Sequence, residues 1–206
     1  SPYAFGVYGA VALDLLTFSG EIDMLGGDDG NNDYKGLQGF FDVAYNMNEM
    51  LTFGGSFYYA KGYEDADENQ ITGVRAGAGT FDALGFGGNL NAWGAPFYLV
   101  GQQNQEGGLF DFTGDNAGVV GGRLYADAAF GEKWNAYARL GYLTPEEDDK
   151  AVTNVDSAMT ASGNVAYQWL PSTTLSAGLA AVAPDFNDNT EDDTQVLGIA
   201  QIQIDW

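Results

Sequence analysis

Carboxylate and guanidinium groups are the reactive side chains that this sequence offers, because the chain contains no His and no Cys. Thiol catalysis is excluded without Cys. A pair of carboxylates could hydrolyse a glycoside, but no pair stands out among the 29 acidic residues. The glycine-rich stretch Gly77-Ala78-Gly79 lacks the strand–turn–helix context of a nucleotide-binding loop. We therefore expect that the protein is not an enzyme.

The charge balance and composition exclude several other classes of protein. The 29 acidic residues against 7 basic ones give a formal net charge of -22, which argues against nucleic acid as a partner, because phosphates are bound by Lys and Arg. An acidic chain of low hydrophobicity would be disordered. Here 45% of the residues are hydrophobic and 14% are aromatic, so we expect a folded chain. Without Cys there is no disulfide framework and no thiolate metal site. No run of about 18 apolar residues exists, so no transmembrane helix is expected.

Side chains alternate between apolar and polar over much of the chain, which is the two-residue period of a β-strand. In the stretch 158–170, Met159 and Tyr167 fall on one face, and Thr160 and Gln168 fall on the other. Stripes with a helical period are missing, and the 30 glycines also disfavour helix. We predict nine strands, over residues 3–13, 16–26, 36–47, 50–61, 117–130, 134–144, 158–170, 174–184 and 195–206.

Three features favour strands that cross a membrane over those of a soluble β-sandwich, whose strands also alternate. The stretches have about 10 to 13 residues, where a tilted membrane strand needs about 9 to 11 and soluble strands have about 5 or 6. Their apolar faces end in aromatic residues, which favour membrane–water interfaces. Short and long connections alternate, as in membrane barrels. The short connections are 14–15, 48–49, 131–133 and 171–173, and the long ones are 27–35, 62–116, 145–157 and 185–194. We therefore predict an all-β, transmembrane, antiparallel up-and-down β-barrel.

The order of strand, short turn, strand and long acidic loop, with a final strand ending in Ile202-Gln203-Ile204-Asp205-Trp206, resembles a Gram-negative porin. In that family the barrel-assembly machinery recognises apolar alternation and a terminal aromatic in the last strand, so the resemblance gives this role to Ile202, Ile204 and Trp206. Phe is the usual last residue, and Trp206 departs from that pattern. The resemblance implies a bacterial outer-membrane location, contact with the lipid bilayer and lipopolysaccharide, and a passive aqueous channel for small hydrophilic solutes or ions. It also allows a homo-oligomer.

Charged residues at the polar positions of the predicted strands would line the pore. Opposing acidic and Arg side chains inside a barrel create a transverse field that selects solutes by charge. The alternative is that they are paired, hydrated charges without a special role. The 55-residue connection 62–116 is too long for a simple loop, and the resemblance suggests that it folds into the lumen, with an external loop as the alternative. The predicted pore-lining residues are Glu21, Asp23, Asp42, Arg75, Arg123, Asp127 and Arg139.

Acidic residues gather in the long connections, where oxygen ligands could hold Ca²⁺ or Mg²⁺. Hydrated loop charge is the alternative explanation. A different function would use the same residues: a structural or adhesive outer-membrane barrel with a closed lumen, whose acidic extracellular loops bind a partner or divalent cations. No other cofactor is expected. The candidate metal ligands are Asp28, Asp29, Asp33, Glu146, Glu147, Asp148 and Asp149.

The odd number of predicted strands bears on how the barrel closes. Strands 3–13 and 195–206 run in the same direction if all neighbours are antiparallel, whereas complete single-chain barrels of this type have an even number of strands. One explanation is that 1–206 is a single barrel domain forming the C-terminal portion of a larger barrel. The remaining strands would then come from the same precursor or from a partner chain. The other is that 16–206 closes as eight or ten strands. We favour the first, because strand 3–13 would otherwise leave an exposed edge.

Overall fold

A computed structural model describes residues 1–62, 70–71, 118–147, 155–186 and 193–204 of the chain. These residues form ten strands of one sheet. Among them, no helix is long and apolar enough to span a membrane. The strands are β1 (Tyr3–Leu13), β2 (Leu16–Asp28), β3 (Asp33–Asn48), β4 (Leu51–Ala60), β5 (Gln70–Ile71), β6 (Val119–Phe130), β7 (Trp134–Thr144), β8 (Val155–Leu170), β9 (Thr173–Phe186) and β10 (Gln195–Ile204).

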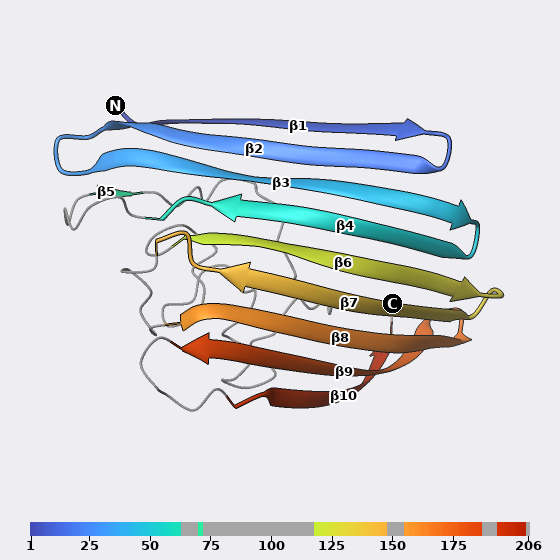
Figure 1. Cartoon of the computed structure of the whole chain (residues 1–206). Helices are drawn as coiled ribbons and strands as arrows, with labels where there is room; N and C mark the ends of the chain where they lie inside the picture. Colours follow the sequence, from blue (N-terminus) through green and yellow to red (C-terminus); the bar gives the residue numbers. More distant parts are fainter. Residues whose placement is uncertain (63–69, 72–117, 148–154, 187–192, 205–206) are drawn as a thin grey trace.

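Nine of these strands form an antiparallel meander in which each strand pairs with the next along the chain. The order is β1-β2-β3-β4-β6-β7-β8-β9-β10, and the two-residue β5 pairs in parallel with the start of β3. Figure 1 shows the strands side by side from β1 to β10, with the short turns at one end and the longer connections at the other. The antiparallel sheet of about nine strands expected from the two-residue period is therefore confirmed.

Alternate side chains lie on opposite faces of a strand, and residues paired across two strands lie on the same face. The register therefore carries one face through the whole sheet. Starting from Phe41 on β3, the ladder runs through Phe57, Gly122, Tyr142 and Met159 to β8. It continues through Ala183 to β9, and the face is apolar throughout. Asp42 follows Phe41 on β3 and therefore lies on the opposite, polar face. Its cross-strand row on that face continues through Ser56 and Arg123.

Large apolar side chains on the first of these faces are exposed. Leu124 is 67% exposed, Met159 and Leu179 are each 65% exposed, and Ile202 is 69% exposed. A folded domain in water normally covers such a face with a second layer, and no described residue covers these four side chains. The fully buried apolar side chains, which include Val119, Leu143 and Val182, lie instead toward the end of the sheet that carries the long connections.

The short turns are joined to the neighbouring hairpins by backbone hydrogen bonds. The carbonyl of Leu15 accepts from the amide of Asn46 at 2.7 Å, and the carbonyl of Met50 accepts from the amide of Ala129 at 2.8 Å. The carbonyl of Lys133 accepts from the amide of Gln168 at 2.8 Å in the same way. These bonds extend the sheet to the tips of the turns.

Predicted connections were too long where the strands continue, as at Val155, where β8 begins within 145–157, and the largest difference is at 27–35. Residues 27–35 were expected to form a long loop, but β2 continues to Asp28 and β3 begins at Asp33, so only 29–32 lie between the strands. The carboxylate of Asp29 folds this four-residue turn by accepting the amides of Asn31 at 2.9 Å and Asn32 at 2.8 Å. Much of the connections 62–116, 145–157 and 185–194 lies outside the described residues.

The two outermost strands, β1 and β10, run in the same direction because seven further meander strands separate them (Figure 1). Within the described residues, β1 pairs only with β2, and β10 pairs only with β9. The pairing of 3–13 with 16–26, which an up-and-down order with a short connection at 14–15 implies, is confirmed. Every residue of β1 is exposed, so this strand is an edge of the described sheet.

Candidate functional site

The central strands β3, β4, β6 and β7 position most of the predicted pore-lining residues on the polar face. Asp42 on β3 is opposite Ser56 on β4, which is in turn opposite Arg123 on β6. Two residues further along β6, Tyr125 is opposite Arg139 on β7. The two-residue period and the register therefore bring together side chains that are up to 97 positions apart, the separation of Asp42 and Arg139.

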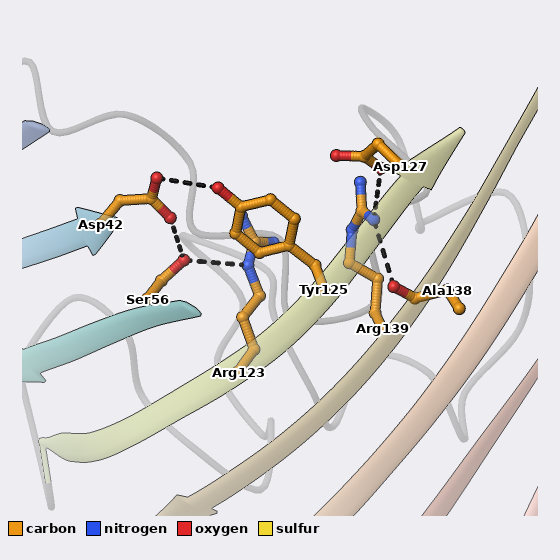
Figure 2. Close-up of polar contacts among 7 residues, drawn as sticks. All are labelled: Asp42, Ser56, Arg123, Tyr125, Asp127, Ala138 and Arg139. Carbon is orange, nitrogen blue, oxygen red and sulfur yellow. Dashed lines mark hydrogen bonds and ion pairs between the residues drawn. The ribbon is translucent and has the colours of Figure 1, made fainter. Parts of the chain in front are cut away.

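Asp42 is the acceptor at one side of this group (Figure 2). Its two carboxylate oxygens accept hydrogen bonds from Ser56 Oγ at 2.6 Å and from Tyr125 Oη at 2.9 Å. Ser56 Oγ in turn accepts from Arg123 Nε at 3.3 Å. Asp42 is therefore linked to Arg123 through a hydroxyl group, and its carboxylate is held by two neutral donors.

Arg139 is the centre of the other side of the group. Its Nη1 donates to Asp127 Oδ1 at 2.7 Å and to the carbonyl of Ala138 at 3.3 Å. The guanidinium carbon lies 4.4 Å from the ring centroid of Tyr137 and 5.4 Å from that of Tyr125. The Arg139 side chain is only 14% exposed, whereas that of Asp127 is 44% exposed. Its pairing and ring contacts therefore hold Arg139 close to the sheet.

Tyr125 joins the two halves of the group. Its ring lies 5.7 Å from the guanidinium carbon of Arg123 as well as 5.4 Å from that of Arg139. Such distances allow cation–π attraction, which is about 0.5–1 kcal/mol at an exposed site. The ring can lie along the strand because its cross-strand neighbour is Gly54, and a Cβ atom at Gly54 would overlap the Tyr125 ring.

The other predicted pore-lining residues are placed apart from this group. Asp23 is buried, and its carboxylate accepts from Gln38 Nε2 at 3.2 Å. Glu21 is half-buried on the same face of β2, opposite Phe40. Arg75 lies outside the described residues. Ser56 and Gly54 were not predicted as site residues, although both occupy polar-face positions of a predicted strand, because a small residue gives no signal of the neighbour that it accommodates.

A hollow of about 270 Å³ lies beside Asp127, toward the short-turn end of the polar face. Its polar lining includes Asn135, Tyr137 and Asn164. Among the described residues, the buried Oδ1 of Asn164 and Nε of Arg139 have no hydrogen-bond partner. Buried polar atoms of this kind are usually satisfied by water, which fits a face that borders an aqueous space.

The candidate metal ligands are dispersed among the described residues, where no three His, Cys, Asp or Glu side chains are grouped to hold an ion. Asp33 pairs with Lys35 at 2.8 Å. Glu146 accepts from Tyr59 Oη at 2.7 Å and from the amide of Gly62 at 2.9 Å. Asp148 and Asp149 lie outside the described residues, so the metal site stays a prediction.

Asp29 uses its carboxylate within its own turn. Besides the two amides, its Oδ2 accepts from Tyr34 Oη at 2.8 Å and from Asn32 Nδ2 at 3.2 Å. The backbone hydrogen bonds from Asn31 and Asn32, followed by the side-chain ones, hold the pKa of Asp29 well below its usual value, although the group is exposed.

The assembly signal proposed for the last strand is described in part. Ile202 and Ile204 lie on the exposed apolar face of β10, opposite Leu175 and Thr173 of β9. Trp206 lies outside the described residues. Comparisons with protein-family models, with curated proteins and with solved structures each found no match to this chain.

Replacing Gly54 tests the contact between Gly54 and the Tyr125 ring. We expect Gly54→Ala to displace the Tyr125 ring and break the hydrogen bond of Tyr125 to Asp42. The free energy of unfolding should fall by about 1.5–3 kcal/mol, the range for a hydrogen bond to a charged group. Gly55→Ala is the matched control, because its Cβ would face the apolar side and meet only Leu124 Cδ2 at 3.3 Å and the Arg123 carbonyl at 3.5 Å. Denaturant unfolding measures both, and equal losses would contradict the contact.

The stability of the turn at 29–32 should depend on pH. Because the pKa of Asp29 is lowered by folding, its stabilisation of the turn is complete above its ordinary pKa of about 4 and is lost as the pH falls through the lower folded value. The protection factors of the Asn31 and Asn32 amides, which correct for the intrinsic pH dependence of exchange, should therefore fall in acid. Asp29→Asn should remove this dependence, and Asp28→Asn, which makes none of these hydrogen bonds, should keep it. An unchanged pH profile in Asp29→Asn would refute the role of the carboxylate.

Proposed function

We propose that these strands form part of a transmembrane β-barrel of the porin kind in a bacterial outer membrane, and that the barrel is a passive aqueous channel for small hydrophilic solutes or ions. The observation that carries this proposal is the single apolar face that continues across nine strands with its large side chains exposed. A bilayer is the solvent that such a face fits, since transmembrane strands place apolar residues outward and polar residues inward.

The polar face supports an aqueous interior. Four carboxylates and two guanidinium groups occupy the polar face of β2, β3, β6 and β7, where they would be costly against hydrocarbon. The hollow beside Asp127 and the unpartnered Oδ1 of Asn164 fit hydration of the same face. Transport would use pore width and lumen charge, without covalent chemistry.

Closure of the barrel is part of the proposal. In hydrocarbon, each unpaired backbone group of an edge strand costs several kcal/mol. β1 and β10 run in the same direction and cannot pair as antiparallel neighbours. We therefore place further strands, from outside the described residues or from a partner chain, between these two edges. The outer-membrane assembly machinery and lipopolysaccharide are the partners that this location implies.

Substituting adjacent residues of β8 tests which face meets lipid. Val165 lies on the apolar face and is 47% exposed, whereas Asn164 lines the polar hollow. We expect Val165→Arg to destabilise the protein in phospholipid vesicles by about 2–4 kcal/mol at mid-membrane depth, and Asn164→Arg by much less. Reversible urea unfolding from vesicles measures both variants. Similar losses would mean that the apolar face does not contact the bilayer.

Conductance tests the channel itself. The intact protein, reconstituted into planar bilayers, should give stable open steps in potassium chloride. A structural or adhesive barrel with a closed lumen would insert into vesicles and protect its strands from protease but remain silent. If the protein inserts and is protected from protease but gives no conductance, the channel proposal is refuted and the structural or adhesive barrel is favoured.

A further inference from the structure

The charges of the polar face are unequal in number and are arranged by strand. The polar face of β2, β3, β6 and β7 carries four acidic side chains and two arginines. Glu21, Asp23 and Asp42 are on β2 and β3, whereas Arg123 and Arg139 are on β6 and β7 with Asp127. The described face is thus net acidic, and its positive charges are confined to two neighbouring strands.

Both arginines are also held against the sheet. Arg139 is bound by Asp127 at 2.7 Å, stacks on Tyr137 and Tyr125, and exposes only 14% of its side chain. Arg123 donates to Ser56 and lies 5.7 Å from the centre of the Tyr125 ring. Figure 2 shows Tyr125 next to both Arg123 and Arg139. A guanidinium that is held beside a ring and, as in Arg139, paired with a carboxylate contributes less positive potential to the adjacent solvent than an extended one.

We propose that this polar face makes the channel selective for cations, and that Tyr125 is a positioning residue for this selectivity because its ring contacts both arginines and adds to the contacts that hold them at the wall. The inference rests on the proposed channel. Small hydrated metal ions and organic ammonium ions are the solutes that it favours. Carboxylates in a cleft with low-dielectric walls concentrate counter-ions, while wall-held arginines offer anions little compensating attraction.

The position of Tyr125 is itself fixed by neighbours rather than by one bond. Its hydroxyl donates to Asp42, Gly54 leaves space for its ring, and β6 lies between β4 and β7. The hydroxyl and the ring therefore make separable contributions. Tyr125→Phe removes the hydrogen bond and keeps an aromatic surface for both arginines. Tyr125→Leu removes the aromatic surface as well, so Arg123 loses its contact with the Tyr125 ring. Arg139 then keeps Asp127 and Tyr137 to hold it at the wall.

The reversal potential across a potassium chloride gradient measures this selectivity in planar bilayers. The wild-type K⁺/Cl⁻ permeability ratio should exceed one and should decline at high salt, because screening shortens the range of the carboxylate field. Tyr125→Leu should lower the permeability ratio by roughly two- to fivefold. This is the factor by which the loss of an ordinary cation–π contact changes the population of arginine side chains held at the ring. Tyr125→Phe should stay near wild type. Glu21→Gln should also lower the ratio, because it removes a polar-face charge outside the Tyr125 contacts.

The outcomes separate this inference from the channel on which it rests. Silent wild-type protein would overturn the channel and the selectivity together. Open channels with a ratio at or below one would overturn cation selectivity alone. Open, cation-selective channels in which Tyr125→Leu and Tyr125→Phe have the same ratio would overturn the positioning role of the Tyr125 ring. Far-ultraviolet circular dichroism of each variant in the same lipid establishes that the strands have formed before conductance is compared.

Discussion

The unbroken antiparallel register is the constraint on which the rest of this sheet depends. The side-chain period of a strand is two, so a slip of one residue between two neighbours would move every apolar side chain of one strand to the opposite face. The register is continuous over all eleven pairs between β1 and β2 and over all eleven pairs between β6 and β7. Its irregularities fall at strand ends, at Asn46/Asn48, Val155/Ser157 and Gln168/Leu170. Bulges at those places bend the strand termini without exchanging the faces of the central sheet.

The same constraint creates the polar group around Tyr125. Asp42, Ser56 and Arg123 form a cross-strand row because β3, β4 and β6 hold one register, and Tyr125 and Arg139 form the next row on β6 and β7. Neither row contains a residue that is unusual in itself. What makes the group specific is the absence of a side chain at Gly54, which lets Tyr125 approach both Asp42 and the two guanidinium groups. One small residue thereby couples the packing of the sheet to the placement of its positive charges.

More of the fold than of the site could be predicted from the sequence. Period-two alternation depends on each residue and its nearest neighbours, so strand positions and the faces of Asp42, Arg123 and Arg139 could be predicted. The turn at 29–32 was missed because the Asp29 side chain closes it, and side-chain hydrogen bonds of that kind have no period. The partners of Asp42 were missed because Ser56 and Tyr125 are 14 and 83 positions away, and only the register decides which distant residues meet.

A two-faced sheet of this kind has two separate requirements in a bilayer, and its side chains meet only one of them. The apolar face can contact hydrocarbon directly, but the backbone groups along the outer edges of β1 and β10 in the described sheet need partners from another strand. A second copy does not provide one in the same orientation. Pairing β1 with β10 of a second copy would be parallel, and pairing β1 with a second β1 would require that copy to be inverted across the membrane. Under the proposed function, the strand beside β1 must therefore run opposite to it, from the short-turn end to the end of the long connections. It must also continue the alternation of apolar and polar side chains, because the cross-strand pairs at Val7 and Ile22 place the apolar face of β1 on the same side as that of β2.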